Sequence, residues 1–130
     1  MTQKDKELLL KDLCVRLPYE VKGLHRGEIQ RLLIIDSFGS YQVNEYDAWF
    51  SLSSVEFKPY LRPMSSMTEE EKQTFISLSN NMIDDWMVKP ETCCYFMDKL
   101  TDWLNEHHFD YRGLIEKGLA LAAPEGMYKN

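Results

Sequence analysis

Apolar residues near the start of the chain recur at the spacing of one helix face. They lie four positions apart, at Leu9, Leu13 and Leu17. Charged residues, among them Asp12 and Arg16, take the opposite, polar face. The proline that follows disfavours the helical conformation of the residue before it. The pattern therefore predicts an amphipathic helix over residues 5–17.

The next part of the chain alternates apolar and polar residues, as half-buried strands do. The alternating or branched-residue segments are 19–22, 28–35, 41–44 and 47–52. Turn-forming residues at 37–40 separate the second from the third. Short strands with short connections predict a small antiparallel sheet in a strand-rich part, 18–57, with barrel-like curvature as an alternative. Pro59 and Pro63 then bracket a stretch that we expect to be an extended linker.

Two helices should follow the sheet. Thr68 and Glu71 form a capping box, in which each side chain binds the other residue's backbone N–H, so a helix should begin there and end before Pro90. A second helix is expected over residues 91–106, and helical character continues over 114–121. The fold class is α+β: an N-terminal helix, a small sheet, and two to three C-terminal helices packed on it. We expect one domain, 1–130, with a helical part at 68–121, and a hydrophobic core shared between the strands and the helices at 75–86 and 93–104.

Charge limits the classes of partner. The chain has 15 Lys and Arg against 21 Asp and Glu, for a formal net charge of −6, and the whole excess lies in residues 66–130. Binding to phosphates needs the opposite sign, so nucleic acid is disfavoured as a partner. No segment has the ~20 apolar residues of a membrane span, and the polar N-terminus lacks a signal-peptide pattern. These features predict a cytoplasmic protein without membrane contact.

Candidate chemistry is sparse. The three cysteines, Cys14, Cys93 and Cys94, form no C-x-x-C motif, so we expect reduced, mostly buried thiols. No phosphate-binding glycine loop or metal-ligand spacing is present, and no cofactor is expected. His107 and His108 are adjacent and cannot share a helix face.

Two functions remain as alternatives. One is a small enzyme built around Glu106, His107 and Asp110, set against histidines that only stabilise a helix end. The other is a sheet-based nucleic-acid binder that uses the aromatic residues of the first half, for which core packing is the favoured explanation. Those aromatic residues are Tyr41, Tyr46, Trp49, Phe50, Phe57 and Tyr60.

Two segments carry a family resemblance. Residues 58–71 (KPYLRPMSSMTEEE) and 102–115 (DWLNEHHFDYRGLI) resemble a group of small uncharacterised proteins of gut anaerobic bacteria and their phages or mobile elements. The resemblance covers roughly residues 55–130 and the leading helix, and the strand region matches less clearly. It implies a mobile-element setting and transfers no activity and no site residues.

The second expected helix carries one candidate interaction surface. Glu91, Asp98, Asp102 and Glu106 recur at intervals of seven, four and four, which places them along one stripe. An acidic stripe can bind a cationic site on another protein, and the mobile-element resemblance favours a basic host protein as that partner. An ordinary solvated helix face is the alternative. The favoured function is therefore a non-enzymatic accessory or protein-interaction domain, whose oligomeric state the sequence leaves open.

Overall fold

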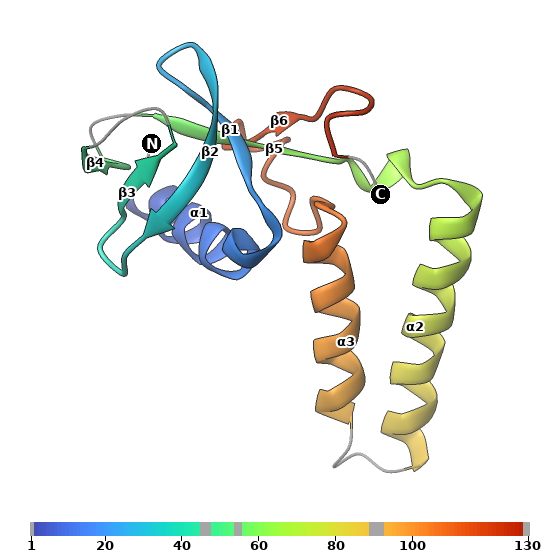
Figure 1. Cartoon of the computed structure of the whole chain (residues 1–130). Helices are drawn as coiled ribbons and strands as arrows, with labels where there is room; N and C mark the ends of the chain where they lie inside the picture. The colour runs from blue at the N-terminus through green and yellow to red at the C-terminus, as the bar shows by residue number, and fades with distance from the viewer. Residues whose placement is uncertain (1, 45–47, 54–55, 89–92, 129–130) are drawn as a thin grey trace.

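Figure 1 shows the computed structural model of the chain, which describes residues 2–44, 48–53, 56–88 and 93–128, without the side chains of 82–86, 88 and 93–96. It confirms the predicted α+β class, with an N-terminal helix, a six-stranded sheet and two further helices. Over the described residues, none of the helices combines the length and the apolar character that a membrane crossing needs.

Helix α1 (Gln3–Arg16) forms close to its predicted position. Thr2 caps its first turn by accepting a hydrogen bond from the backbone N–H of Asp5, whose carboxylate accepts one from the N–H of Thr2. Leu9 and Leu13 are buried as the periodicity predicts. After Arg16 the chain tightens into the short 3-10 helix η1 (Leu17–Tyr19), which contains the predicted proline break.

The sheet has strand order β4-β3-β2-β1-β5-β6. The strands are β1 (Lys22–His25), β2 (Glu28–Ile35), β3 (Ser40–Val43), β4 (Phe50–Ser51), β5 (Phe57–Leu61) and β6 (Leu121–Ala122). The first four form the predicted antiparallel meander, after which β5 returns to pair with β1. Strand β6 runs parallel to β5, so the sheet is mixed rather than purely antiparallel, and it stays open.

Two strand predictions need correction. The strand expected at 19–22 begins only at Lys22, because η1 and the left-handed backbone of Glu20 (φ 63°) occupy the preceding residues. The stretch after Pro59, expected to be a linker, belongs to β5. Proline is tolerated there because β6 pairs with β5 only from Tyr60 onward, so β5 is bonded on one side at Pro59.

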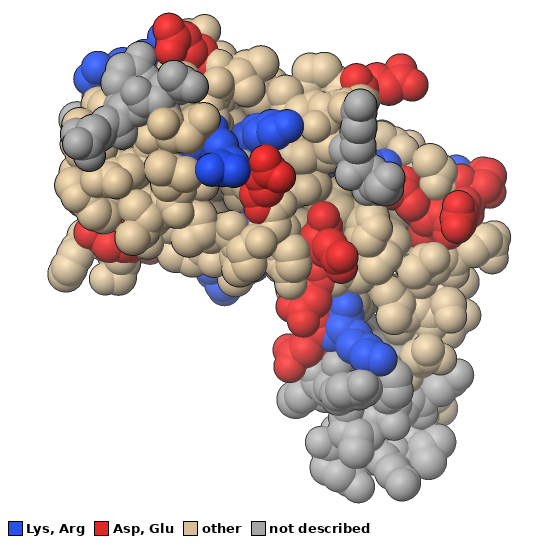
Figure 2. Space-filling view, viewed as in Figure 1, with Lys and Arg blue, Asp and Glu red and all other residues tan. Residues whose placement is uncertain are grey.

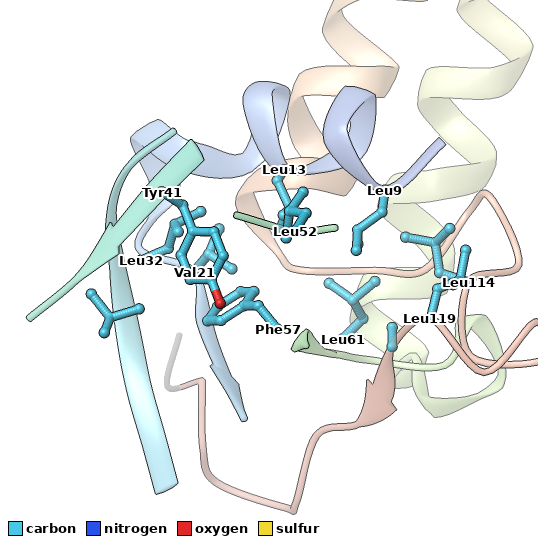
Figure 3. Close-up of a cluster of buried hydrophobic side chains, with 12 residues drawn as sticks. Leu9, Leu13, Val21, Leu32, Tyr41, Leu52, Phe57, Leu61, Leu114 and Leu119 are labelled. Carbon is cyan, nitrogen blue, oxygen red and sulfur yellow. The ribbon is translucent and has the colours of Figure 1, made fainter. Parts of the chain in front are cut away.

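The main core lies between α1 and the concave face of the sheet (Figure 3). Its buried members come from α1, the strands and residues adjacent to them, and the segment after α3: Leu9, Leu13, Val21, Leu32, Tyr41, Val43, Leu52, Phe57, Leu61, Leu114, Leu119 and Ala120. A glycine is required at Gly23, since a Cβ atom there would lie 2.4 Å from Cζ of Phe57. The sheet can therefore bring its β1 backbone directly against the core.

Helices α2 (Glu69–Val88) and α3 (Cys93–Glu106) lie side by side as a hairpin that extends away from the sheet (Figure 1). The predicted capping box is confirmed: the N–H of Glu71 donates to Oγ1 of Thr68 at 3.1 Å, and the N–H of Thr68 donates to Glu71 at 2.9 Å. Helix α2 ends at Val88, before Pro90 as expected.

Among the side chains that the structure describes, none from the hairpin belongs to the main core, contrary to the shared core expected from the sequence. Around the base of the hairpin lies a second cluster of buried Met67, Leu104 and Phe109, against which Phe75 and Trp103 pack. Leu9 and Leu13 of α1 and residues of the 114–120 segment pack on the inner face of the sheet. The hairpin is therefore attached to the sheet body at its base.

The helix expected over residues 114–121 is also absent. This segment forms successive turns and then β6. Asp110 holds the first turn, since its carboxylate accepts hydrogen bonds from the N–H groups of Leu114 and Ile115. Gly113 and Gly118 have φ angles of +73° and +74°, which no right-handed helix contains.

A buried ionic network joins α1 to the corner of the chain that follows α3. Asp12 and Arg16 are both fully buried, although the sequence pattern places them on a polar face. Arg16 donates through Nε to Asp12 at 2.7 Å and through Nη2 to the carbonyl oxygen of Phe109 at 2.7 Å. Arg112 donates to the second carboxylate oxygen of Asp12 at 2.8 Å. The pairing explains why two charged residues can enter the interior.

Asp12→Asn should lower the free energy of unfolding by about 3–5 kcal/mol, because it leaves the buried guanidinium of Arg16 without its counter-charge. Urea denaturation monitored by circular dichroism measures the change. Glu7→Gln removes the same charge from an exposed position of α1 and should change stability by less than about 0.5 kcal/mol. Equal midpoints for the two variants would contradict the structural role of the network.

Candidate functional site

The chain turns sharply after α3, and this corner brings two aromatic rings from distant parts of the sequence together. His108 adopts a left-handed backbone conformation, with φ of 63°. Its ring stacks on the ring of Tyr128, with centroids 3.6 Å apart and planes at 12°. The ammonium of Lys22, at the start of β1, lies 6.0 Å from the centroid of the Tyr128 ring.

The hydroxyl of Tyr128 is bound by backbone groups alone. It donates to the carbonyl oxygen of Tyr60 at 2.7 Å and accepts from the N–H of Lys22 at 3.1 Å. The carbonyl oxygen of Lys22 lies 3.2 Å away as a second acceptor. Burial raises the pKa of Tyr128 to about 12, which keeps the hydroxyl protonated as a donor.

Burial also sets the protonation state of His108. It lowers the pKa of the imidazole to about 4, and the positive charges of Arg16, His107, Arg62 and Lys22 act in the same direction. The ring is therefore neutral near pH 7. A neutral imidazole can serve as a stacking surface and is not a cationic anchor in this site.

Two hollows lie beside Tyr128. One, of about 380 Å³, is lined by Lys22, His108 and Tyr128 together with Glu20, Gly126 and Met127. The other, of about 420 Å³, shares Gly126 and Tyr128 and extends to Arg62 and Thr68. Residues of the segment 126–128 thus line both solvent-accessible hollows.

Arg62 supports the corner from the hairpin side. Its guanidinium binds both carboxylate oxygens of Glu71 at 2.7 Å and lies 4.2 Å from the centroid of the Phe109 ring. The hydrogen bond from Arg62 is the main reason that the pKa of Glu71 falls to about 2. Two backbone hydrogen bonds also join Arg62 to this corner: the N–H of Arg62 donates to the carbonyl oxygen of His108, and the N–H of Asp110 donates to the carbonyl oxygen of Arg62.

The residues of the proposed small enzyme do not form a common site. Both carboxylate oxygens of Asp110 accept backbone hydrogen bonds, and Asp110 is buried. The ring of His107 packs on Trp103, and its Nδ1 lies 2.9 Å from the Trp103 carbonyl oxygen. Glu106 is exposed at the end of α3. Within the described part of the chain, no three His, Cys, Asp or Glu residues are grouped as metal ligands.

The acidic stripe lies on the exposed side of α3. Asp98, Asp102 and Glu106 are all exposed, and Figure 2 shows acidic side chains in a row along this helix, with basic atoms beside them. Residues four apart on a helix are about 6 Å apart along its axis. Glu91, the fourth predicted member, lies outside the described residues. The row is therefore available to a partner over the length of α3 that the structure describes.

The outer face of the sheet has mixed charge. Lys22 and Arg31 face each other across β1 and β2, and Figure 2 shows basic atoms there with an acidic side chain against them. Arg31 lies 3.9 Å from Glu20, and Lys58 lies 3.3 Å from Glu56. These pairs reduce the positive potential that a nucleic-acid surface needs.

The aromatic residues of the first half divide between core and surface. Tyr41 and Phe57 are fully buried, which supports the core-packing interpretation for them, whereas Trp49 is 53% exposed and Tyr46 lies outside the described residues. Cys14 is exposed, contrary to the expected mostly buried thiols, because it lies on α1 away from the core face. The side chains of Cys93 and Cys94 lie outside the description.

The sequence pattern does not indicate Tyr128 or Lys22 as site residues. The hydroxyl of Tyr128 and the backbone of Lys22 are separated by 106 positions, and a lone tyrosine in a glycine-containing segment carries no pattern that indicates its contact. His108 was recognised only as half of a histidine pair. Its stacking partner depends on the path of the chain after β6.

The depressed pKa of His108 predicts that acid destabilises the fold between pH 6.5 and 4, because the unfolded chain binds the proton more tightly. Lowering the pH from 7 to 5 should reduce the free energy of unfolding of wild type by about 1–2 kcal/mol more than that of His108→Asn. Asparagine is chosen because it tolerates the left-handed backbone conformation of this position. The stabilising contribution of ionised Glu71 is lost only below about pH 4.5, so it does not affect this comparison. Urea midpoints at both pH values test this, with Glu7→Gln, a substitution at an exposed position of α1, as the control that keeps the wild-type dependence. The same pH dependence in His108→Asn would refute the assignment.

No family model, no curated protein and no solved structure was found to match this chain. Its candidate sites are therefore assigned from the geometry of the chain itself.

Proposed function

We propose that this chain is a non-enzymatic protein-interaction domain, of the accessory type found on mobile elements, that uses the α2–α3 hairpin to bind a basic protein. The observation that carries the proposal is the hairpin itself, which extends from the sheet body and leaves much of its surface to solvent (Figure 1). A scaffold of sheet and α1 that holds two helices at their base is suited to presenting a binding surface.

The chemistry of the hairpin surface supports a cationic partner. Asp98, Asp102 and Glu106 supply a row of three exposed carboxylates on α3, with one basic residue, Lys99, between the first two in the sequence. Large apolar side chains are exposed on the same hairpin, with Met87 at 73% and Met97 and Ile76 at 49% each. Flexible methionine side chains adapt to different apolar partners, and carboxylates steer a basic protein toward the surface before contact.

The test is an affinity capture from a lysate of the source organism with three bait proteins. The first is wild type, and the second carries Asp98→Lys, Asp102→Lys and Glu106→Lys. The third is a matched control that carries Glu7→Lys, Glu116→Lys and Glu125→Lys, all at exposed positions away from α3. Each reversal adds two charges, so both variants move from a net charge of −6 to zero.

We expect wild type and the control variant to capture the same basic protein. The α3 variant should capture at least about tenfold less of it, as measured by quantitative mass spectrometry. Binding to wild type should also weaken steeply with added salt, because the Debye length falls from about 10 Å at 0.1 M to about 3 Å at 1 M salt. Equal retention by the α3 variant, with circular dichroism showing that it is folded, would reject the hairpin as the binding surface.

A further inference from the structure

The slot occupied by Tyr128 has the construction of a ligand site. A flat imidazole, that of His108, supports the ring at 3.6 Å, and the ammonium of Lys22 lies over the same ring at 6.0 Å from its centroid. The two hollows beside the ring, of about 380 and 420 Å³, each lie within the size range of small-molecule pockets. Tyr128 lines both hollows, together with Gly126.

The polar end of the slot is complementary to a hydroxyl group. Strands β1 and β5 pair as far as Gly23 and Pro59, and beyond that point the N–H of Lys22 and the carbonyl of Tyr60 bind the phenol oxygen. A neutral hydroxyl can donate and accept at once, as this pair of backbone groups requires. An ether oxygen cannot donate to the carbonyl, and an ionised oxygen would face two carbonyl oxygens, those of Tyr60 and Lys22.

The segment that inserts Tyr128 is held lightly. Pro124, Glu125 and Gly126 are exposed, and Gly126 has a φ of +83° in the turn that sends the chain back. Within the described residues, the hydrogen bonds from 124–128 to other elements are those of the Tyr128 hydroxyl and one bond of 3.4 Å from Nζ of Lys22 to the carbonyl oxygen of Met127. The ring of Tyr128 is thus the main anchor of its own segment.

We infer that the slot is a binding site for a 4-hydroxyphenyl group, and that residues 124–128 form a strap whose Tyr128 competes with the ligand for it. A ligand of this class replaces the phenol of Tyr128 on His108 and keeps the same backbone hydrogen bonds. Displacement of the strap joins the two hollows, so a ligand larger than a phenol ring can extend into either. The hydroxyphenyl group can come from a free phenol or from a tyrosine side chain of another chain.

The experiment uses the full chain with Tyr128→Gly, which empties the slot, and p-cresol, which has the structure of the missing side chain. Thermal denaturation and amide and imidazole NMR shifts of Lys22 and His108 measure binding. We expect a saturable rise in melting temperature at millimolar p-cresol, and at least fivefold weaker binding of 4-methylanisole, whose hydroxyl is methylated. Wild type, in which Tyr128 competes for the slot, should show the same shifts only at higher p-cresol concentrations. The control Met127→Gly alters the strap beside the ring and should behave like wild type.

Each outcome of this experiment either supports or rejects the slot as a binding site. If Tyr128→Gly is unfolded alone, refolding by p-cresol but not by 4-methylanisole supports the site, and failure of p-cresol to refold it rejects the site. Equal binding of both compounds, or equal shifts in wild type, also rejects it. Tighter binding of N-acetyl-tyrosinamide than of p-cresol identifies a tyrosine side chain as the ligand source, and the reverse order identifies a free phenol. Loss of the α3 interaction leaves this result unaffected, since the slot and the acidic row share no residue.

Discussion

The buried pair of Asp12 and Arg16 is the interaction on which the arrangement of the other elements depends. Arg16 uses one nitrogen for Asp12 and another for the carbonyl oxygen of Phe109, and Arg112 returns to the same carboxylate. Each charge on its own would be costly to bury, whereas the group together satisfies both oxygens of Asp12. One end of α1 is thereby fixed to the corner after α3, with both residues sealed from solvent.

Residues at this corner also make hydrogen bonds and ring contacts with three other parts of the chain. Toward the hairpin, Arg62 stacks over Phe109 and binds Glu71, which also completes the cap of α2. Toward the sheet, Asp110 shapes the turns that carry the chain into β6. Toward the C-terminal side, His108 supports Tyr128. His108, which has a left-handed backbone conformation after α3, therefore lies where the contacts to the hairpin, to the sheet and to the C-terminal segment come together.

The separation of the two apolar clusters has a functional consequence. Within the described residues, α1 and residues 114–120 pack on the inner face of the sheet, whereas α2 and α3 pack on each other and on the small cluster around Met67, Leu104 and Phe109, with a further contact between α3 and α1. Their outer faces stay in solvent, and that is where the carboxylates of α3 and the exposed methionines lie. The hairpin surface and the Tyr128 slot are thus two separate features of one scaffold, one charged and extended, the other small and enclosed.

Local features of this protein follow from the sequence alone, because they depend on residues a few positions apart. The capping box at Thr68 and Glu71, strand β2 and the apolar face of α1 are of this kind, and together they establish the α+β class. The acidic row on α3 is local in the same sense, since helix geometry places every fourth residue on one face.

Only the tertiary structure decided the features that join distant residues. The bond from Arg16 to Phe109 spans 93 positions, that from Arg112 to Asp12 spans 100, and those from Tyr128 to Lys22 span 106. A helical pattern shows which residues share a face, but it cannot show that a charged face will find partners and become buried. The pairing of β5 with β1 instead of β4, and the position of the hairpin beside the main core, also depend on contacts between distant parts of the chain.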